Sequence, residues 1–248
     1  MKTAVRIEKK AHFGDRELRR AVIAPEVSEV EDWAYAACPR LAEVWIPLGC
    51  RLSNKAFQDS GALERVFLYE TEDKAVNASP ELLALSLLSW PSYTAEALEA
   101  AADEARFLSW FDDRLKLYLA EADDADYTSF PAGGEEDYDD ELLGRGRHIR
   151  ARRERKAKMC FERLLAKPEA AGEEFAGYLK RYDPDIPFAL IRGAGDRRAV
   201  YEKLYFKHCR HSHAQLQTLL DCAGDDAELR ALIMKELGES SVLDLLEI

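Results

Sequence analysis

Four residues with metal-ligand side chains lie within the short segment HCRHSH, residues 208–213. They are His208, Cys209, His211 and His213. Imidazole nitrogens and thiolates are ligands that zinc prefers, but this spacing matches no closed zinc motif. The segment also lies where an amphipathic run ends, and a helix C-terminus favours histidine while Ser212 could cap the next helix. We favour this helix-end interpretation and predict no cofactor, with a metal site as the alternative.

An acidic segment is followed directly by a basic one. Residues 121–141 hold ten Asp or Glu and no Lys or Arg, and Pro131 with two glycines predicts a loop there. The basic helix predicted at residues 145–158 offers a possible anion-binding set, namely Arg147, Arg150, Arg152, Arg153, Arg155 and Lys156. Such a set can bind phosphate or nucleic acid. Because opposite charges this close in sequence have a high effective concentration for each other, we favour intrachain pairing.

No known catalytic motif is found in the sequence. The chain lacks GxSxG, GxxxxGK[ST], HExxH and the Rossmann glycine fingerprint. The adjacent acids Glu135, Glu136 and Asp137 lie in the predicted loop, where nothing would bury one of them as acid–base chemistry requires. We therefore expect a non-enzymatic protein. An enzyme of unrecognised type stays the alternative, because catalytic groups can assemble from distant residues, and segment 208–213 would be its starting point.

The elements that must position these residues begin with an N-terminal pattern that recurs every 22–23 residues. Leu18, Leu41 and Leu63 each precede apolar residues at the third and fifth following positions. Six residues before each leucine stands a ring, in His12, Tyr35 and Phe57. The alternation after each leucine predicts a short strand. One such unit cannot bury its own apolar side, so we expect several units to stack and share a core.

At these residues the sequence resembles the BspA-like (Treponema-type) leucine-rich repeat, with its L-x-x-V-x-I-P and A-F-x-x-C-x-x-L segments. The resemblance covers roughly residues 1–70. It departs from the family pattern at Ala21, Ala24 and Ser60, where the family favours an aliphatic residue, a proline and a cysteine. The resemblance implies a short β-solenoid that binds other macromolecules.

Strand alternation predicts which residues face outward. If Val44 and Ile46 point inward, the outward columns across neighbouring strands are Arg20, Glu43 and Arg65, and Val22, Trp45 and Phe67. An apolar ladder beside charged residues commonly marks an interface. The alternative is that the chain's own helices cover this face or cap the end of the sheet.

The rest of the chain reads as helices. Helix starts are predicted at Ser79-Pro80 and Thr94, and the last third predicts helices at roughly 169–181, 184–192, 196–209, 213–223 and 226–237. Turns at Gly195-Asp196 and Gly224-Asp225 resemble those of ankyrin-like or HEAT-like helical repeats. We expect an α+β protein, with a leucine-rich-repeat solenoid at residues 1–75 and an all-helical domain at residues 78–248.

Composition narrows the function classes. The 248 residues carry a net charge of −12, which argues against nucleic acid as a partner of the whole chain. No signal-peptide core or run of about 20 apolar residues is present, and five scattered cysteines favour reduced thiols. We therefore predict a cytoplasmic protein-interaction module, with no membrane association, that binds an unidentified protein through the apolar ladder or between its domains. Binding of nucleic acid or phosphate through residues 145–158 is the alternative.

Overall fold

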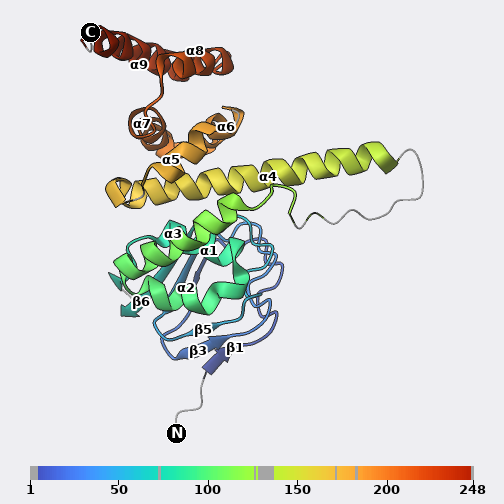
Figure 1. The fold of residues 1–248 in the computed structure, drawn as a ribbon. Coiled ribbons are helices and arrows are strands. Elements are labelled where there is room, and N and C mark those ends of the chain that lie inside the picture. The colour runs from blue at the N-terminus through green and yellow to red at the C-terminus, as the bar shows by residue number, and fades with distance from the viewer. Residues whose placement is uncertain are drawn as a thin grey trace. The chain divides into compact units, whose positions relative to one another are not determined.

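The computed structural model describes residues 5–71, 74–125, 127, 137–170, 172–181 and 184–246 (Figure 1). Contacts divide the chain into two compact units, Met1–Arg114 and Leu115–Ile248. The division falls within helix α3 (Glu104–Ala120), so the first two helices belong to the unit that holds the strands. The predicted division at residues 75–78 marks the change from strands to helices. As a division between domains it stays a prediction.

The N-terminal unit contains two small sheets. The first has the order β1 (Val5–Ile7), β3 (Val27–Val30), β5 (Arg51–Leu52), and the second has the order β2 (Arg20–Val22), β4 (Glu43–Pro47), β6 (Arg65–Thr71), β7 (Lys74–Ala75). All neighbouring strands are parallel except β7, which is antiparallel to β6. The even spacing of the strand sequences brings each strand beside the one that lies 22 or 23 residues later.

Alternation along the second sheet separates core from surface. Ala21, Val44 and Val66 stand side by side and are buried, as are Ile46 and Leu68 further along β4 and β6. Rings of His12, Tyr35 and Phe57 stack in sequence, with centroids 4.9 and 5.8 Å apart. His12 is exposed at the end of this stack, whereas burial of Tyr35, Phe57 and the inward strand residues supplies the main driving force for this unit.

The predicted leucine-rich-repeat solenoid is wrong. The strands form two separate small sheets of three and four strands, accompanied by helices, instead of one continuous coil. Parallel stacking ends at β6 because β7 turns back antiparallel beside it and α1 (Pro80–Ser89) packs against it. The α+β class fits, whereas the repeat architecture assigned to it does not.

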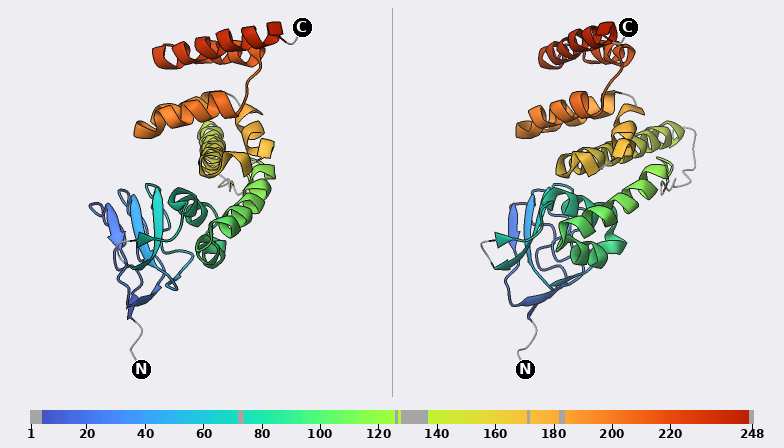
Figure 2. Two further views of the ribbon diagram at one scale, coloured as in Figure 1. Left: turned by 90° about the vertical axis from the view of Figure 1, so that its left-hand side faces the viewer. Right: turned by 60° about the vertical axis from the view of Figure 1, so that its left-hand side comes forward.

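The β6 edge of the second sheet is capped by a side chain. Asn77 is buried, its Oδ1 accepts from the Leu68 amide at 2.8 Å, and its Nδ2 donates to the Val66 carbonyl at 2.9 Å. The Val76 amide also donates to the Leu68 carbonyl, at 2.8 Å. An exposed strand edge invites pairing with other chains, and these bonds satisfy its backbone groups instead. Figure 2 shows α1 next to the last of the blue-to-cyan strands.

The first helices start close to the predicted positions. Proline begins α1, where its missing amide costs no helical bond, but Ser79 makes no side-chain cap hydrogen bond. Thr94 is the first residue of α2 (Thr94–Ala101) instead of its cap, and its hydroxyl donates to the Pro91 carbonyl in the short 3-10 turn Pro91–Tyr93. The rings of Trp90, Phe107, Trp110 and Phe111 form a cluster within the unit.

The described part of the C-terminal unit is helical. It contains α4 (Asp137–Ala166), α5 (Gly172–Arg181), α6 (Asp185–Gly193), α7 (Arg198–Lys203), α8 (His213–Cys222) and α9 (Ala227–Leu246), with a π-helical turn at Leu204–His208. The predicted loop at 121–141 is too long, because residues 137–141 already belong to α4; residues 126 and 128–136 lie outside the described residues. Ser212 caps α8 in a capping box with Gln215, as its sequence position predicts.

The core of the C-terminal unit combines aromatic side chains with a buried carboxylate. Phe161 stacks on Tyr201 with centroids 4.7 Å apart, and the buried Glu162 accepts one hydrogen bond each from Nη1 and Nη2 of the partly exposed Arg197, both at 2.7 Å. The Tyr201 hydroxyl donates to the same carboxylate.

Within the described residues, no helix combines the length and the apolar character needed to cross a membrane. The cytoplasmic location stays a prediction.

Candidate functional site

A row of charges crosses the sheet β2–β4–β6. The strand register places Arg20 beside Glu43 and Glu43 beside Arg65. Nε of Arg20 lies 2.8 Å from Glu43 Oε1, and Nη2 of Arg65 lies 2.9 Å from Glu43 Oε2. The glutamate side chain is 18 % exposed, while the two arginine side chains are 58 % and 48 % exposed. The surface therefore presents one carboxylate held between two accessible guanidinium groups.

An apolar column runs alongside this row. Val22, Trp45 and Phe67 stand in register, and the rings of Trp45 and Phe67 stack with centroids 4.4 Å apart. Trp45 Nε1 donates to Glu43 Oε1 at 2.7 Å, and the Arg20 guanidinium lies 5.5 Å from the Trp45 ring centroid. The charged row thus fixes the orientation of the rings through hydrogen-bond and cation–π contacts.

The face formed by these two columns stays accessible. Val22 is 51 % exposed, and Trp45 and Phe67 are half-buried. On β6 the buried ring of Tyr69 lies 6.4 Å from Trp45, and its hydroxyl donates to the carbonyl of Ile23 beyond β2. This bond spans β4 and holds the three strands together. Such a rigid, partly apolar face, which we call the ladder face, can bind a partner.

A second charged row lies on the sheet β1–β3–β5. Arg6 stands beside Glu29, and Glu29 stands beside Arg51, with Arg51 Nη2 at 3.5 Å from Glu29 Oε2. Sequence reasoning missed this row. Its members are separated by the same 23 and 22 residues as Arg20, Glu43 and Arg65, so extending the alignment would have found it.

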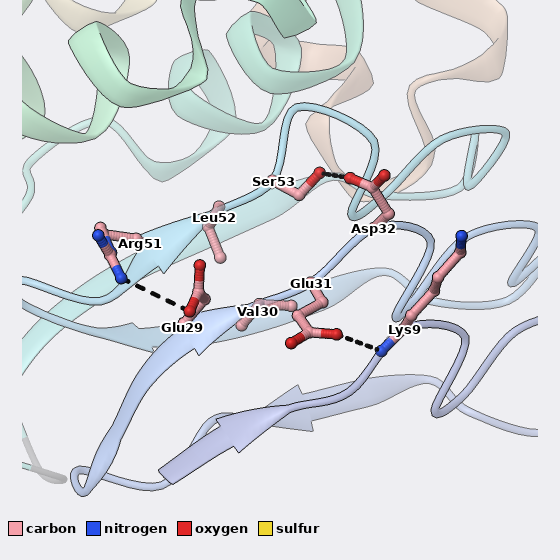
Figure 3. Close-up of a pocket in the computed structure, with 8 residues that line it drawn as sticks. All are labelled: Lys9, Glu29, Val30, Glu31, Asp32, Arg51, Leu52 and Ser53. Carbon is pink, nitrogen blue, oxygen red and sulfur yellow. Dashed lines mark hydrogen bonds and ion pairs between the residues drawn. The ribbon is translucent and has the colours of Figure 1, made fainter. Parts of the chain in front are cut away.

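A polar groove of about 490 Å³ adjoins the second row (Figure 3). The backbone amide of Lys9 donates to Glu31 at 3.1 Å, and the Ser53 hydroxyl donates to Asp32. The groove is lined by Lys9, Glu29, Val30, Glu31, Asp32, Arg51, Leu52 and Ser53. The lining holds no histidine or cysteine, and its serine hydroxyl donates to a carboxylate and accepts from the Lys55 amide at 3.2 Å. It therefore offers hydrogen bonds to a ligand but no nucleophile–histidine pair.

Three lysines surround one tryptophan in the turns of the same unit. The Nζ atoms of Lys9, Lys10 and Lys55 lie 4.7, 5.6 and 5.1 Å from the centroid of Trp33. Trp33 Nε1 donates to Gln58 Oε1 at 3.0 Å. Lys10, Trp33 and Lys55 are again 23 and 22 residues apart, a signal that the sequence contained. The cation–π contacts give this cluster a role within the fold.

The predicted anion-binding set is mostly engaged within the chain. Lys156 is fully buried, and its Nζ donates to Asp123 Oδ1 at 2.9 Å and to the Glu121 carbonyl at 2.7 Å. Arg153 Nε also donates to Asp123, at 2.7 Å, and Arg152 pairs with Glu121. Burial alone would raise the pKa of Asp123, but the hydrogen bonds from Arg153 and Lys156 outweigh it and lower that pKa.

The remaining members of the set lie on the surface of α4. Arg150 pairs with Glu154 one turn along the helix at 2.9 Å, and Arg147 and Arg155 are exposed. Arg145, just outside the set, pairs with Asp124. The structure therefore joins the start of the acidic segment to the basic helix.

The metal candidates do not converge. His208 is exposed, whereas Cys209 is buried and His211 lies against Tyr205, with Nε2 at 2.8 Å from the Tyr205 carbonyl and ring centroids 4.6 Å apart. His213 Nε2 instead contacts Gln217 Nε2 at 3.2 Å. In the part of the chain that the structure describes, no group of three or more His, Cys, Asp or Glu could hold a metal ion.

The buried thiols are poorly suited to nucleophilic chemistry. Burial raises the pKa of Cys50 to about 11 and that of Cys209 to about 12, and it raises the pKa of the fully enclosed Cys160 well above its ordinary value. A thiol reacts as its thiolate, so these groups are unreactive near neutral pH.

Cys50 also lines an apolar groove of about 450 Å³ between residues 47–52 and α2.

A comparison with models of known protein families, with curated proteins and with solved structures finds no match. The expected membership of the BspA-like leucine-rich-repeat family, and the likeness to ankyrin-like or HEAT-like repeats, are therefore wrong: no family model matches, and the strands build two small sheets instead of a solenoid.

Proposed function

We propose that the chain is a protein-binding module that acts through the ladder face of β2, β4 and β6. The observation that carries this proposal is the stacked Trp45–Phe67 pair, half exposed beside Val22 and oriented by Glu43. Aromatic side chains and arginines are the residues most enriched at the energetic centres of protein interfaces. A preorganised pair also loses little conformational freedom when a partner binds.

Two observations weigh against the alternatives. Four of the cations on α4 pair with the acids of residues 121–124, so binding nucleic acid there would have to break existing ion pairs. In the described residues, the candidate groups for catalysis are either dispersed or buried as protonated thiols. A binding role is therefore favoured over both nucleic-acid binding and catalysis.

Affinity capture from native lysate tests the proposal. The intact chain is compared with Trp45→Glu and with Trp110→Glu, a matched change of a half-buried tryptophan on α3. We expect a set of captured proteins that Trp45→Glu loses and Trp110→Glu keeps. The same captured proteins with both variants would contradict the proposal.

A second variant guards against a simple folding defect. Val22→Glu alters the most exposed member of the column without removing a ring. We expect this variant to unfold at the same denaturant concentration as the native chain and to lose the same proteins as Trp45→Glu. Full capture by a folded Val22→Glu variant would mean that the ladder face does not bind them.

A further inference from the structure

The two ends of the second sheet differ in how the backbone groups of their strands are hydrogen-bonded. At one edge β7 pairs with β6, and Asn77 completes the bonding of Leu68 and Val66. At the other edge β2 is the last strand, and no described strand pairs with its outer side. The long parallel strand β6 is therefore covered by the short strand β7 and by Asn77, whereas β2 is uncovered and we call its outer side the open edge.

The open edge presents backbone groups in a regular pattern. The Arg19 carbonyl accepts from the Glu43 amide at 3.3 Å, and the Ile23 amide donates to the Trp45 carbonyl at 2.9 Å, so both residues bond toward β4. Alternate residues of a strand direct their backbone groups to opposite edges. Arg20 and Val22 therefore direct their amides and carbonyls toward the open side.

The side chains of β2 determine which kind of strand can pair with its open edge. On its paired side, Arg20, Ala21 and Val22 stand beside Glu43, Val44 and Trp45, which are an acid, an inward aliphatic residue and an outward aromatic residue. The open side carries the same three side chains. A strand of acid–aliphatic–apolar sequence would continue both columns, and its carboxylate would face the Arg20 guanidinium, whose side chain is 58 % exposed.

The surroundings of this edge favour an acidic and apolar segment. Residues 5–22 hold six Lys or Arg and only three Asp or Glu, in a chain whose net charge is −12. Val22 in β2 and Phe13 in the loop that leads to β2 are exposed apolar residues. A second copy would bring this basic edge against itself. A partner segment with carboxylates meets opposite charge and apolar surface together.

We propose that an extended segment of a partner protein, with the sequence pattern acid–aliphatic–apolar, adds to the open edge of β2 as a further strand. The proposal rests on the ladder face being the binding site and names the partner's chemistry and binding mode. Backbone hydrogen bonds to Arg20 and Val22 supply affinity, and the two columns supply specificity, as in other cases of strand addition. The short length of β2 and the charge of Arg20 limit unspecific pairing.

A peptide copying residues 41–48, LAEVWIPL, is the probe, because its central residues are those that β2 already accepts on its other side. Binding to the intact chain is followed by titration in amide-resolved NMR spectra. We expect the largest shifts at the amides of Arg20 and Val22, and at least about tenfold weaker binding when the peptide's glutamate is replaced by lysine. Peptides N-methylated on the backbone should not bind.

Variants of the chain make the test specific. Arg20→Glu should reverse the preference, so that the lysine peptide binds better than the glutamate peptide. Val22→Pro removes an outward amide and should abolish binding, whereas Ala42→Ser, just before the first residue of the central strand β4, serves as a control that keeps it. Equal binding of the glutamate and lysine peptides, or shifts remote from β2, would overturn the proposal, as would a dimer formed through β2.

The outcome separates this inference from the proposed function. If Trp45→Glu loses captured proteins while Val22→Pro keeps them, partners bind the ladder face without adding a strand, and only the inference fails. If both variants keep the captured proteins, the proposed function fails as well.

Discussion

The ammonium group of Lys156 on α4, with no exposed surface, lies 2.9 Å from the carboxylate of Asp123, whose side chain is 12 % exposed. Removing one member of a buried ion pair leaves the other charge without compensation, which costs about 3–5 kcal/mol. We expect Asp123→Asn to lower the free energy of unfolding by about 2–4 kcal/mol, since the Glu121 carbonyl still accepts from Lys156. Urea titration followed by circular dichroism measures this loss.

The matched control for this pair is Asp124→Asn. Asp124 pairs with Arg145, and both side chains are well exposed. Solvent screens an ion pair this exposed, so this variant should unfold at nearly the same urea concentration as the native chain. A similar loss in the two variants would mean that the burial of Lys156 does not determine the stability of this segment.

The Asn77 cap gives a second prediction. Asn77→Ala removes one bond to the Leu68 amide and one to the Val66 carbonyl, and both of these residues are buried. We expect the free energy of unfolding to fall by about 1–3 kcal/mol, and slow aggregation to follow because a strand edge becomes available. Asn54→Ala, an exposed asparagine in a turn, is the control and should change stability by less than about 0.5 kcal/mol.

The sequence predicted local order better than architecture. Spacing placed Arg20, Glu43 and Arg65 in adjacent strands because side chains at a fixed repeat in parallel strands must stand side by side. The sequence spacing could not show that the Asn77 side chain bonds to β6 as a neighbouring strand would, because its two hydrogen bonds depend on the path of the chain after β7. The solenoid prediction was wrong for a related reason. The sequence period predicts which strands pair with each other, but it does not predict at which strand the pairing ends.

Charge patterning was informative only in part. The proximity of the acidic and basic segments indicated that they pair, and Asp123 does contact Arg153 and Lys156. Nothing in the composition distinguished Lys156, which is buried, from Arg155, which is exposed, because that difference depends on the helix face that packs against Tyr118. The dispersal of His208 and His211 likewise follows from the π-helical turn, which periodicity does not reveal.

His211 gives a prediction for pH dependence. Burial lowers the pKa of His211 from its ordinary 6.5 to about 4, although the hydrogen bond to the Tyr205 carbonyl opposes this, and nearby Lys180 lowers it further. The unfolded chain therefore binds a proton at a higher pH than the folded protein. The contribution of neutral, buried His211 to the free energy of unfolding is therefore fully present above pH 6.5. It is lost as the pH drops toward 4, so that the free energy of unfolding falls by about 1–3 kcal/mol.

The test of this prediction compares urea unfolding at pH 7 and pH 5 for three chains. His211→Gln cannot titrate and should lose less stability between these values than the native chain. His208→Gln changes an exposed histidine and should retain the native pH dependence. An unchanged pH dependence in His211→Gln would assign the effect to other groups.

Cysteine accessibility gives a fourth prediction. Four of the five cysteines are buried, and Cys222 on α8 is partly exposed. We expect DTNB to label Cys222 first under native conditions, because reaction needs an accessible thiolate. Cys222→Ser should remove this fast phase and Cys160→Ser should leave it. A fast phase that survives Cys222→Ser would show that one of the buried thiols becomes accessible through local opening.

The two charged rows differ in how tightly their central glutamate is held. Glu43 contacts Arg20 and Arg65 at 2.8 and 2.9 Å and accepts from Trp45, whereas Glu29 contacts Arg51 at 3.5 Å. We expect Glu43→Gln to lower the free energy of unfolding by about 1–2 kcal/mol and Glu29→Gln by less than about 0.5 kcal/mol. Part of the loss in Glu43→Gln should disappear at high salt, because its arginines are accessible to solvent. Equal losses from the two substitutions in urea titrations would mean that Glu43 does not order the ladder face, and the preorganised rings on which the binding proposal rests would need another source of rigidity.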